Sequence, residues 1–171
     1  MKGHAIISHG LQSSPEATKA IALAQVARDL GWTTELPDYR DLDAVSELGD
    51  IAARIARLDA RAEAAGASLV LAGSSMGAFV SARVSLRRPV LGLFLMAPPT
   101  QLQGFSLRLE AARVPTRIVH GWHDELIPAG EVVRWAQARS DALLLVDDSH
   151  RLAAHVEFCA QEFGRLLQAL A

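Results

Sequence analysis

The sequence is poor in several residue types, and each shortage excludes a class of protein. Cys159 is the only cysteine among 171 residues, which excludes an internal disulfide framework and favours a reducing compartment. Aromatic residues make up only 5% of the chain and show no stacking pattern, and the basic residues are scattered. With a formal net charge of −2 as well, nucleic-acid binding is not expected.

A long hydrophobic run is also missing. The first residues contain one lysine and a short apolar segment that ends at Ser8, which is too brief for a signal peptide or a membrane span. We therefore expect a cytoplasmic protein that does not associate with a membrane. The length, with 50% hydrophobic residues, fits a single domain over residues 1–171 that buries a substantial core.

Short apolar runs alternate along the chain with longer segments of helical period. This alternation is typical of βαβ units, in which helices cover both faces of a parallel sheet. We predict an α/β fold, a doubly wound three-layer sandwich around a mostly parallel sheet of about six strands. The predicted strands cover residues 4–8, 33–37, 68–72, 90–96, 116–120 and 142–146, and the predicted helices cover residues 17–30, 46–65, 78–84, 128–139 and 152–170.

The second predicted helix carries several charged residues. Asp50 and Arg54 are four residues apart, as are Arg57 and Arg61. Such spacing is typical of a solvated helix face. We expect these four side chains to lie in solvent and assign no function to them.

The most informative motif is Gly73-Ser74-Ser75-Met76-Gly77, which directly follows an apolar strand. Gly-x-Ser-x-Gly between a strand and a helix is the pattern of a nucleophile elbow. The two glycines have no Cβ and therefore permit a tight turn around the central serine. We predict that Ser75 is the nucleophile and Ser74 only its neighbour. A glycine-rich crossover in any α/β protein can contain a serine. Whether Ser75 is catalytic therefore depends on the residues that can act as its partners.

Ligands of doubly wound sheets bind beyond the carboxyl ends of the strands, so the partners of Ser75 are expected there. His150 follows the sixth predicted strand in a polar loop, whereas His155 comes later, inside the last helix. His120 is expected to end a buried strand, and His123 to be an exposed loop residue. We predict that His150 is the general acid and base.

Three aspartates compete for the role of the acid that orients the histidine. Asp124 follows the fifth predicted strand, whereas Asp147 and Asp148 lie so near His150 in the sequence that geometry would point them elsewhere. We predict Asp124, with Glu125 at the rim of the site. The resulting order of nucleophile, acid and histidine is the chain order of the α/β-hydrolase triad.

The oxyanion of an acyl-transfer reaction needs two fixed backbone donors. One comes from the residue after the nucleophile and the other from the loop after the first strand. Met76 and Leu11 occupy these places. Gly10 allows the loop to turn close to the elbow, and His9 is expected to brace this loop rather than act as a base.

Four segments together resemble a known family: residues 9–15, 73–77, 120–128 and 148–150. They are similar to the corresponding motifs of small bacterial serine esterases of the α/β-hydrolase superfamily. The opening His-Gly-x-x-Ser-Ser-Pro resembles that of the YqiA-type esterases. The resemblance implies hydrolysis of carboxylic esters through an acyl-enzyme, with a small-molecule ester as the substrate and without a metal or organic cofactor.

The chain departs from this family in two ways. It starts directly at the strand that carries the oxyanion loop, without the antiparallel strands that often precede it. Residues 98–115, where larger relatives insert a cap domain, are too few to form one. We therefore expect an open cleft that accepts small soluble esters with short acyl groups. The predicted substrate-binding residues are Gly10, Pro99, Trp122 and Leu126, and further candidates for the cleft are Met96, Pro98, Phe105 and Ile127.

Two alternative functions stay open from the sequence. Thioester or small-amide hydrolysis would use the same acyl chemistry and the same residues. A non-catalytic binding protein could also keep the fold and the motifs, although it would have no chemical need for all three side chains. The sequence does not indicate an oligomeric state.

Overall fold

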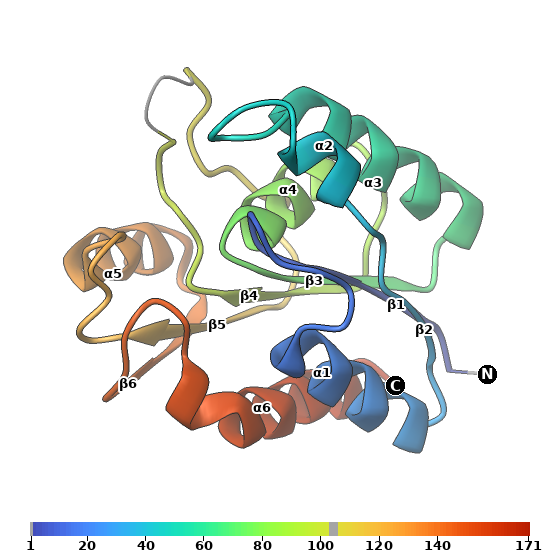
Figure 1. Ribbon diagram of the computed structural model, residues 1–171. Helices are drawn as coiled ribbons and strands as arrows, with labels where there is room; N and C mark the ends of the chain where they lie inside the picture. The colour runs from blue at the N-terminus through green and yellow to red at the C-terminus, as the bar shows by residue number, and fades with distance from the viewer. Residues whose placement is uncertain (1, 103–105) are drawn as a thin grey trace.

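The computed structural model describes residues 2–102 and 106–171, which build a six-stranded sheet between two layers of helices (Figure 1). The strands are β1 His4–Ser8, β2 Thr33–Glu35, β3 Leu69–Ser74, β4 Gly92–Met96, β5 Thr116–Gly121 and β6 Ala142–Val146. The helices are α1 Thr18–Asp29, α2 Arg40–Asp43, α3 Ile51–Ala65, α4 Met76–Ser85, α5 Ala129–Arg139 and α6 Val156–Ala169, and a 3₁₀ turn, Ala153–His155, precedes α6.

The sheet has the strand order β2-β1-β3-β4-β5-β6, and every neighbouring pair of strands is parallel. The chain runs from β1 outward to β2 and then returns to the other side of β1 to form β3. The direction of winding therefore reverses between β1 and β3. In open α/β sheets the crevice at such a reversal, beyond the carboxyl ends of the strands, is where ligands bind. The loop after β1 and the turn after β3 meet at this point.

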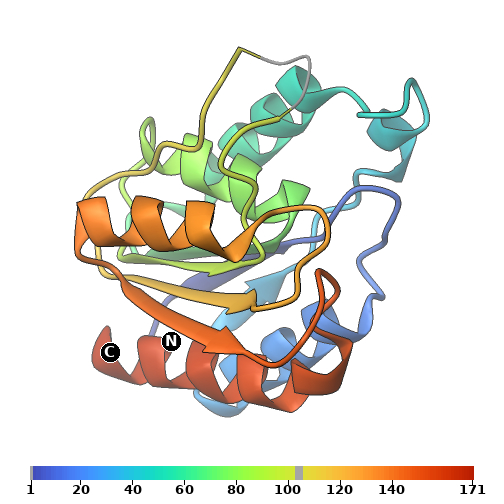
Figure 2. The same ribbon diagram turned by 90° about the vertical axis from the view of Figure 1, so that its left-hand side faces the viewer.

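Alternate residues of the strands pack against different helices. On one face, Ile6, Leu71 and Leu93 join the apolar side chains of α3, α4 and α5. On the other face, Ile7 and Phe94 join those of α1 and α6. Figure 2 shows α5 and α6 on opposite sides of β5 and β6. Because helices cover both faces of the sheet, its central strands β3 and β4 are nearly continuous buried runs, whereas the edge strand β2 is polar.

These observations confirm the predicted three-layer fold, with shifts at the ends of elements. β2 ends at Glu35 and β4 begins at Gly92, so both strands are shorter than predicted. The helix predicted over residues 46–65 begins only at Ile51, because the Asp50 carboxylate accepts a hydrogen bond from the Ala53 N–H and caps it. The short helix α2 was not predicted.

The described residues between β4 and β5 contain no helix and none of the six strands, so they form no cap domain. In the part of the chain that the structure describes, no helix combines the length and apolarity needed to cross a membrane. Phe105, one of the further cleft candidates, lies outside the described residues.

Candidate active site

Ser75 lies at a strained turn between β3 and α4. Its backbone has φ 52° and ψ −117°, a conformation that is rare for a residue with a side chain. The Ser75 N–H donates to the carbonyl of Met96 at 2.8 Å, which fixes the turn against the end of β4. A Cβ on Gly73 would collide with the backbone of Gly77, and one on Gly77 with the backbone of Ser8. Only glycine at both positions permits this close approach.

His150 reaches Ser75 from the loop after β6. Its Nε2 lies 2.9 Å from Ser75 Oγ, and its Nδ1 lies 2.7 Å from Asp124 Oδ2. An ionised carboxylate can only accept hydrogen bonds, so Nδ1 carries the proton and donates to Asp124. Nε2 is then the free acceptor that faces the Ser75 hydroxyl, as a general base requires.

Asp124 follows β5 and is buried. Burial alone would raise the pKa of its carboxyl group. Hydrogen bonds from His150 and from the N–H groups of Ile127 and Leu126 outweigh burial, so the pKa lies below its usual value. The Asp124 carboxylate is therefore ionised and held in a fixed orientation at neutral pH.

The competing residues are engaged elsewhere. Asp148 accepts a hydrogen bond from His155 Nδ1 at 2.8 Å, and exposed Asp147 pairs with exposed His123 at 3.0 Å. Glu125 accepts a hydrogen bond from the His150 N–H at 3.1 Å, so it holds the histidine loop. The structure thus brings together the three side chains that the sequence analysis selected.

The two predicted oxyanion donors both lie at the carboxyl ends of central strands. Met76 is the first residue of α4, so its N–H has no partner within the helix. Leu11 follows β1 in the neighbouring loop. A Cβ on Gly10 would be 3.6 Å from the Ser75 Cβ, which places this loop against the nucleophile. Among the described residues, no acceptor binds the Leu11 N–H.

One prediction about the second helix was wrong. Arg54 is fully buried rather than solvated, and it forms an ion pair with Asp43 behind the loop that follows β1. The sequence contains a signal for this burial, because residue 54 falls on the helical face formed by Ile51, Ile55 and Leu58. The spacing of the charged residues, taken alone, indicated a solvated position for Arg54 instead.

The predicted substrate-binding residues differ in exposure. Trp122 and Leu126 are 56% and 68% exposed, which is unusual for large apolar side chains, and both follow β5 close to Asp124. Pro99 is buried rather than open to a substrate. Gly10 lies against the elbow. Of the further candidates, Met96, Pro98 and Ile127 are buried.

Comparison with solved structures reveals a whole-chain match. A protein from Xanthomonas campestris pv. campestris, whose name places it among hydrolases of the alpha/beta superfamily, shares 53% sequence identity with a TM-score of 0.95. The match covers 98% of this chain and 99% of that one. The chain belongs to the α/β hydrolase superfamily. Scans against protein-family models and against curated protein sequences find no match.

Two more distant members of the superfamily have similar structures. An α/β serine hydrolase homologue from Coxiella burnetii is 25% identical with a TM-score of 0.72, and the match covers 100% of this chain and 86% of that one. A serine hydrolase without a lid from Xanthomonas campestris is 20% identical with a TM-score of 0.68, covering 96% and 81%. The second comparison shows that the α/β hydrolase fold exists without a lid.

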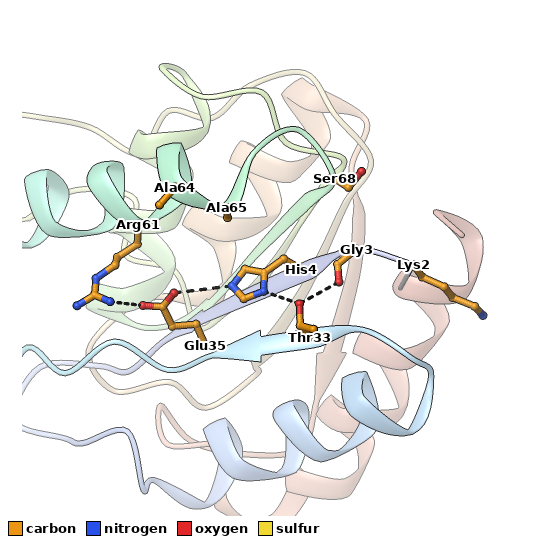
Figure 3. Close-up of a pocket in the computed structure, with 9 residues that line it drawn as sticks. All are labelled: Lys2, Gly3, His4, Thr33, Glu35, Arg61, Ala64, Ala65 and Ser68. Carbon is orange, nitrogen blue, oxygen red and sulfur yellow. Dashed lines mark hydrogen bonds and ion pairs between the residues drawn. The ribbon is translucent and has the colours of Figure 1, made fainter.

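The α/β hydrolase sheet has a hollow of about 460 Å³ at the end opposite the triad, lined by residues at the start of β1 and β2 and at the end of α3 (Figure 3). There His4 Nδ1 lies 2.7 Å from Thr33 Oγ1, which superficially resembles a base and a nucleophile. The Thr33 hydroxyl, however, donates to the Gly3 carbonyl, so His4 donates to it and is not placed to take its proton. Glu35 forms its close ion pair with Arg61, at 2.9 Å, and its other oxygen lies 3.8 Å from His4 Nε2, which is too far for a hydrogen bond. This hollow does not form a second triad.

We expect the stability of this α/β hydrolase to fall as the pH drops below about 6.5, the usual pKa of histidine. Burial lowers the pKa of His9 and of His120 in the folded protein. Below pH 6.5 the unfolded chain therefore binds protons that the folded protein does not, and the free energy of unfolding decreases by up to about 1.4 kcal/mol per pH unit for each histidine. Urea unfolding at several pH values measures this slope.

Two variants test the origin of the slope. His120→Asn should make the pH dependence shallower, because it removes one of the two buried histidines. His123→Asn is the matched control and should leave the slope unchanged, since that side chain is exposed. An unchanged slope in His120→Asn would contradict the assignment.

Proposed function

We propose that this chain is a serine carboxylesterase that hydrolyses small esters with short acyl groups through an acyl-enzyme. The observation that carries the proposal is the continuous chain of contacts from Ser75 Oγ through His150 to Asp124, at 2.9 and 2.7 Å. The proposed oxyanion donors, the N–H groups of Leu11 and Met76, belong to the loop after β1 and to the turn after Ser75, at the switch point of the sheet. A nucleophile, a base, an orienting acid and oxyanion donors are the parts that acyl transfer requires.

In the first step, Ser75 Oγ attacks the carbonyl carbon of the ester while His150 Nε2 takes the hydroxyl proton. The carbonyl oxygen becomes an oxyanion that accepts hydrogen bonds from the N–H groups of Leu11 and Met76. The tetrahedral intermediate then collapses, and the bond to the leaving alcohol breaks. His150 donates its proton to the alcohol oxygen, which leaves an acyl group on Ser75.

In the second step, water attacks the acyl-enzyme. His150 takes a proton from the water, the same two N–H groups bind the new oxyanion, and collapse releases the acid. The proton on His150 returns to Ser75 Oγ. Asp124 stays ionised throughout and stabilises the imidazolium that forms in each half of the reaction.

The absence of a cap among the described residues supports small substrates. Trp122 and Leu126, which follow β5 on either side of Asp124, expose their apolar side chains to solvent. A long acyl chain would therefore stay largely in water and add little binding energy. Water also has free access to the acyl-enzyme, which favours hydrolysis.

We expect hydrolysis of p-nitrophenyl esters to be fastest for acyl chains of roughly two to four carbons and to decline for longer chains. Each methylene buried in a deep pocket would instead contribute about 0.8 kcal/mol and raise kcat/KM severalfold. A chain-length series with monomeric substrates measures this preference. A maximum at octanoate or beyond would show that an acyl wall exists and would overturn the short-acyl proposal.

Related acyl substrates distinguish the proposal from its alternatives. Thioesters and small amides can react with the same triad, so each is compared with the ester of the same acyl group. A higher kcat/KM for the thioester or the amide would overturn the esterase assignment in favour of thioester or amide hydrolysis. No turnover of any of them in folded protein would favour a binding protein that keeps the hydrolase fold.

A further inference from the structure

A buried ion pair lies directly behind the loop that follows β1. Arg54 of α3 is fully buried, and its Nε and Nη2 donate to the two carboxylate oxygens of Asp43, each at 2.7 Å. The Arg54 guanidinium also lies over the ring of Tyr39, 4.5 Å from its centroid. A buried ion pair adds little net stability compared with apolar side chains of similar size. The contacts of this ion pair therefore indicate its role better than its contribution to the stability of the fold does.

The remaining donors of Arg54 hold the backbone of the loop. Nη1 donates to the carbonyl of His9 at 3.0 Å, and Nη2 donates to the carbonyl of Gly10 at 3.1 Å. The Gly10 carbonyl and the Leu11 N–H belong to one planar trans peptide unit, so they point in opposite directions. Holding the Gly10 oxygen against Arg54 therefore directs the Leu11 N–H away from the guanidinium.

The peptide unit on the other side of Leu11 is held as well. The Gln12 N–H donates to Asp43 Oδ2 at 3.3 Å. The ion pair thus fixes both peptide units that flank Leu11, one through Arg54 and the other through Asp43.

His9 forms a second hydrogen bond with the Gly10 oxygen. Its Nε2 accepts a hydrogen bond from the Tyr39 N–H at 3.0 Å, so the ring proton is on Nδ1, which donates to the Gly10 carbonyl at 2.7 Å. The Gly10 oxygen therefore accepts two hydrogen bonds, one of them from a cation. Hydrogen bonds to a carbonyl polarise its peptide unit and strengthen the N–H at the other end as a donor.

We propose that Arg54 and Asp43 are positioning residues that orient and polarise the peptide unit whose Leu11 N–H binds the oxyanion. The inference rests on the serine-hydrolase function proposed above and deepens it. Neither side chain contacts the substrate. Their effect is on an interaction that strengthens as the oxyanion forms, so it changes kcat more than KM.

The experiment replaces the pair by apolar residues of similar size, Arg54→Met/Asp43→Leu, so that no unpaired charge remains in the core. Two quantities are measured: kcat and KM for p-nitrophenyl acetate, and the inhibition constant of a short trifluoromethyl ketone. That ketone reacts with Ser75 to form a hemiketal, whose oxygen is an oxyanion in the same position. We expect kcat/KM to fall roughly 10- to 100-fold and the inhibitor to bind weaker by the same factor, with KM nearly unchanged.

The inhibition constant separates positioning from a general loss of structure. A partly unfolded preparation would contain fewer active sites, but the sites that remain would keep their inhibition constant. Arg61→Met is the matched control on the same helix, because Arg61 is 56% exposed and pairs with Glu35 far from the elbow. It should leave both quantities unchanged.

Arg54→Lys provides a second variant, which keeps a positive charge but cannot hold both carbonyls and the carboxylate at once. It should show the same parallel losses to a smaller extent. An inhibition constant within twofold of the wild type in either folded variant would overturn the inference, and so would a wild-type kcat. Failure of the proposed function looks different, since the wild type itself would then neither hydrolyse the ester nor bind the ketone.

Discussion

Ser75→Ala and His150→Ala are each expected to reduce ester hydrolysis on the order of 10⁴- to 10⁶-fold, with the fold intact. Without Ser75 Oγ no acyl-enzyme can form, and without His150 Nε2 the hydroxyl keeps its proton. The two losses are expected to be similar and not additive, because the residues act as one unit. Measuring kcat/KM of both single variants and of the double variant tests this.

Covalent labelling identifies the nucleophile independently of turnover. A fluorophosphonate should attach to Ser75, because an activated serine beside oxyanion donors attacks such a reagent rapidly. Mass spectrometry of the digested protein locates the adduct. Ser74→Ala is the matched control at the neighbouring position and should keep both labelling and turnover. An adduct on Ser74, or none in folded wild-type protein, would disprove the assignment of the nucleophile.

That the nucleophile, the acid and the histidine lie close together was predictable, because each of them follows a strand. Carboxyl ends of parallel strands lie along one edge of the sheet, so Ser75 after β3, Asp124 after β5 and His150 after β6 had to be near one another. The distances were not predictable. They depend on the positive φ of Ser75 and on the hydrogen bonds that turn the Asp124 carboxylate toward the histidine.

The sequence analysis did not predict the ion pair of Arg54 and Asp43 behind the loop after β1, and the reason is physical. Arg54 is four residues after Asp50, and this spacing of opposite charges usually marks a solvated helix face. Its real partner, Asp43, belongs to α2, which is too short to produce a periodic pattern. A pairing between α2 and α3 depends on tertiary structure, whereas the apolar face of α3 was visible in the sequence.

Asp124→Asn is expected to lower kcat/KM on the order of 10³-fold or more. The asparagine side chain has nearly the same shape, but its amide has no negative charge to stabilise the imidazolium. It can also present its NH₂ group to His150 Nδ1, which would favour the wrong tautomer and place the proton on Nε2, where it opposes Ser75 Oγ. Steady-state kinetics at fixed pH, together with a thermal unfolding measurement, separate this effect from a loss of stability.

Asp147→Asn supplies the matched control, since it makes the same carboxylate-to-amide change at an exposed residue of the loop that carries His150. It should retain wild-type turnover, because the Asp147 side chain is exposed and its ion pair in the described structure is with exposed His123. If Asp124→Asn kept normal turnover while Asp148→Asn lost it, the carboxylate that follows β6 would be the acid instead. The geometry argues against that outcome: Asp148 Oδ2 accepts hydrogen bonds from His155 Nδ1 and the Ala154 N–H, so it is directed toward the 3₁₀ turn before α6 rather than toward His150.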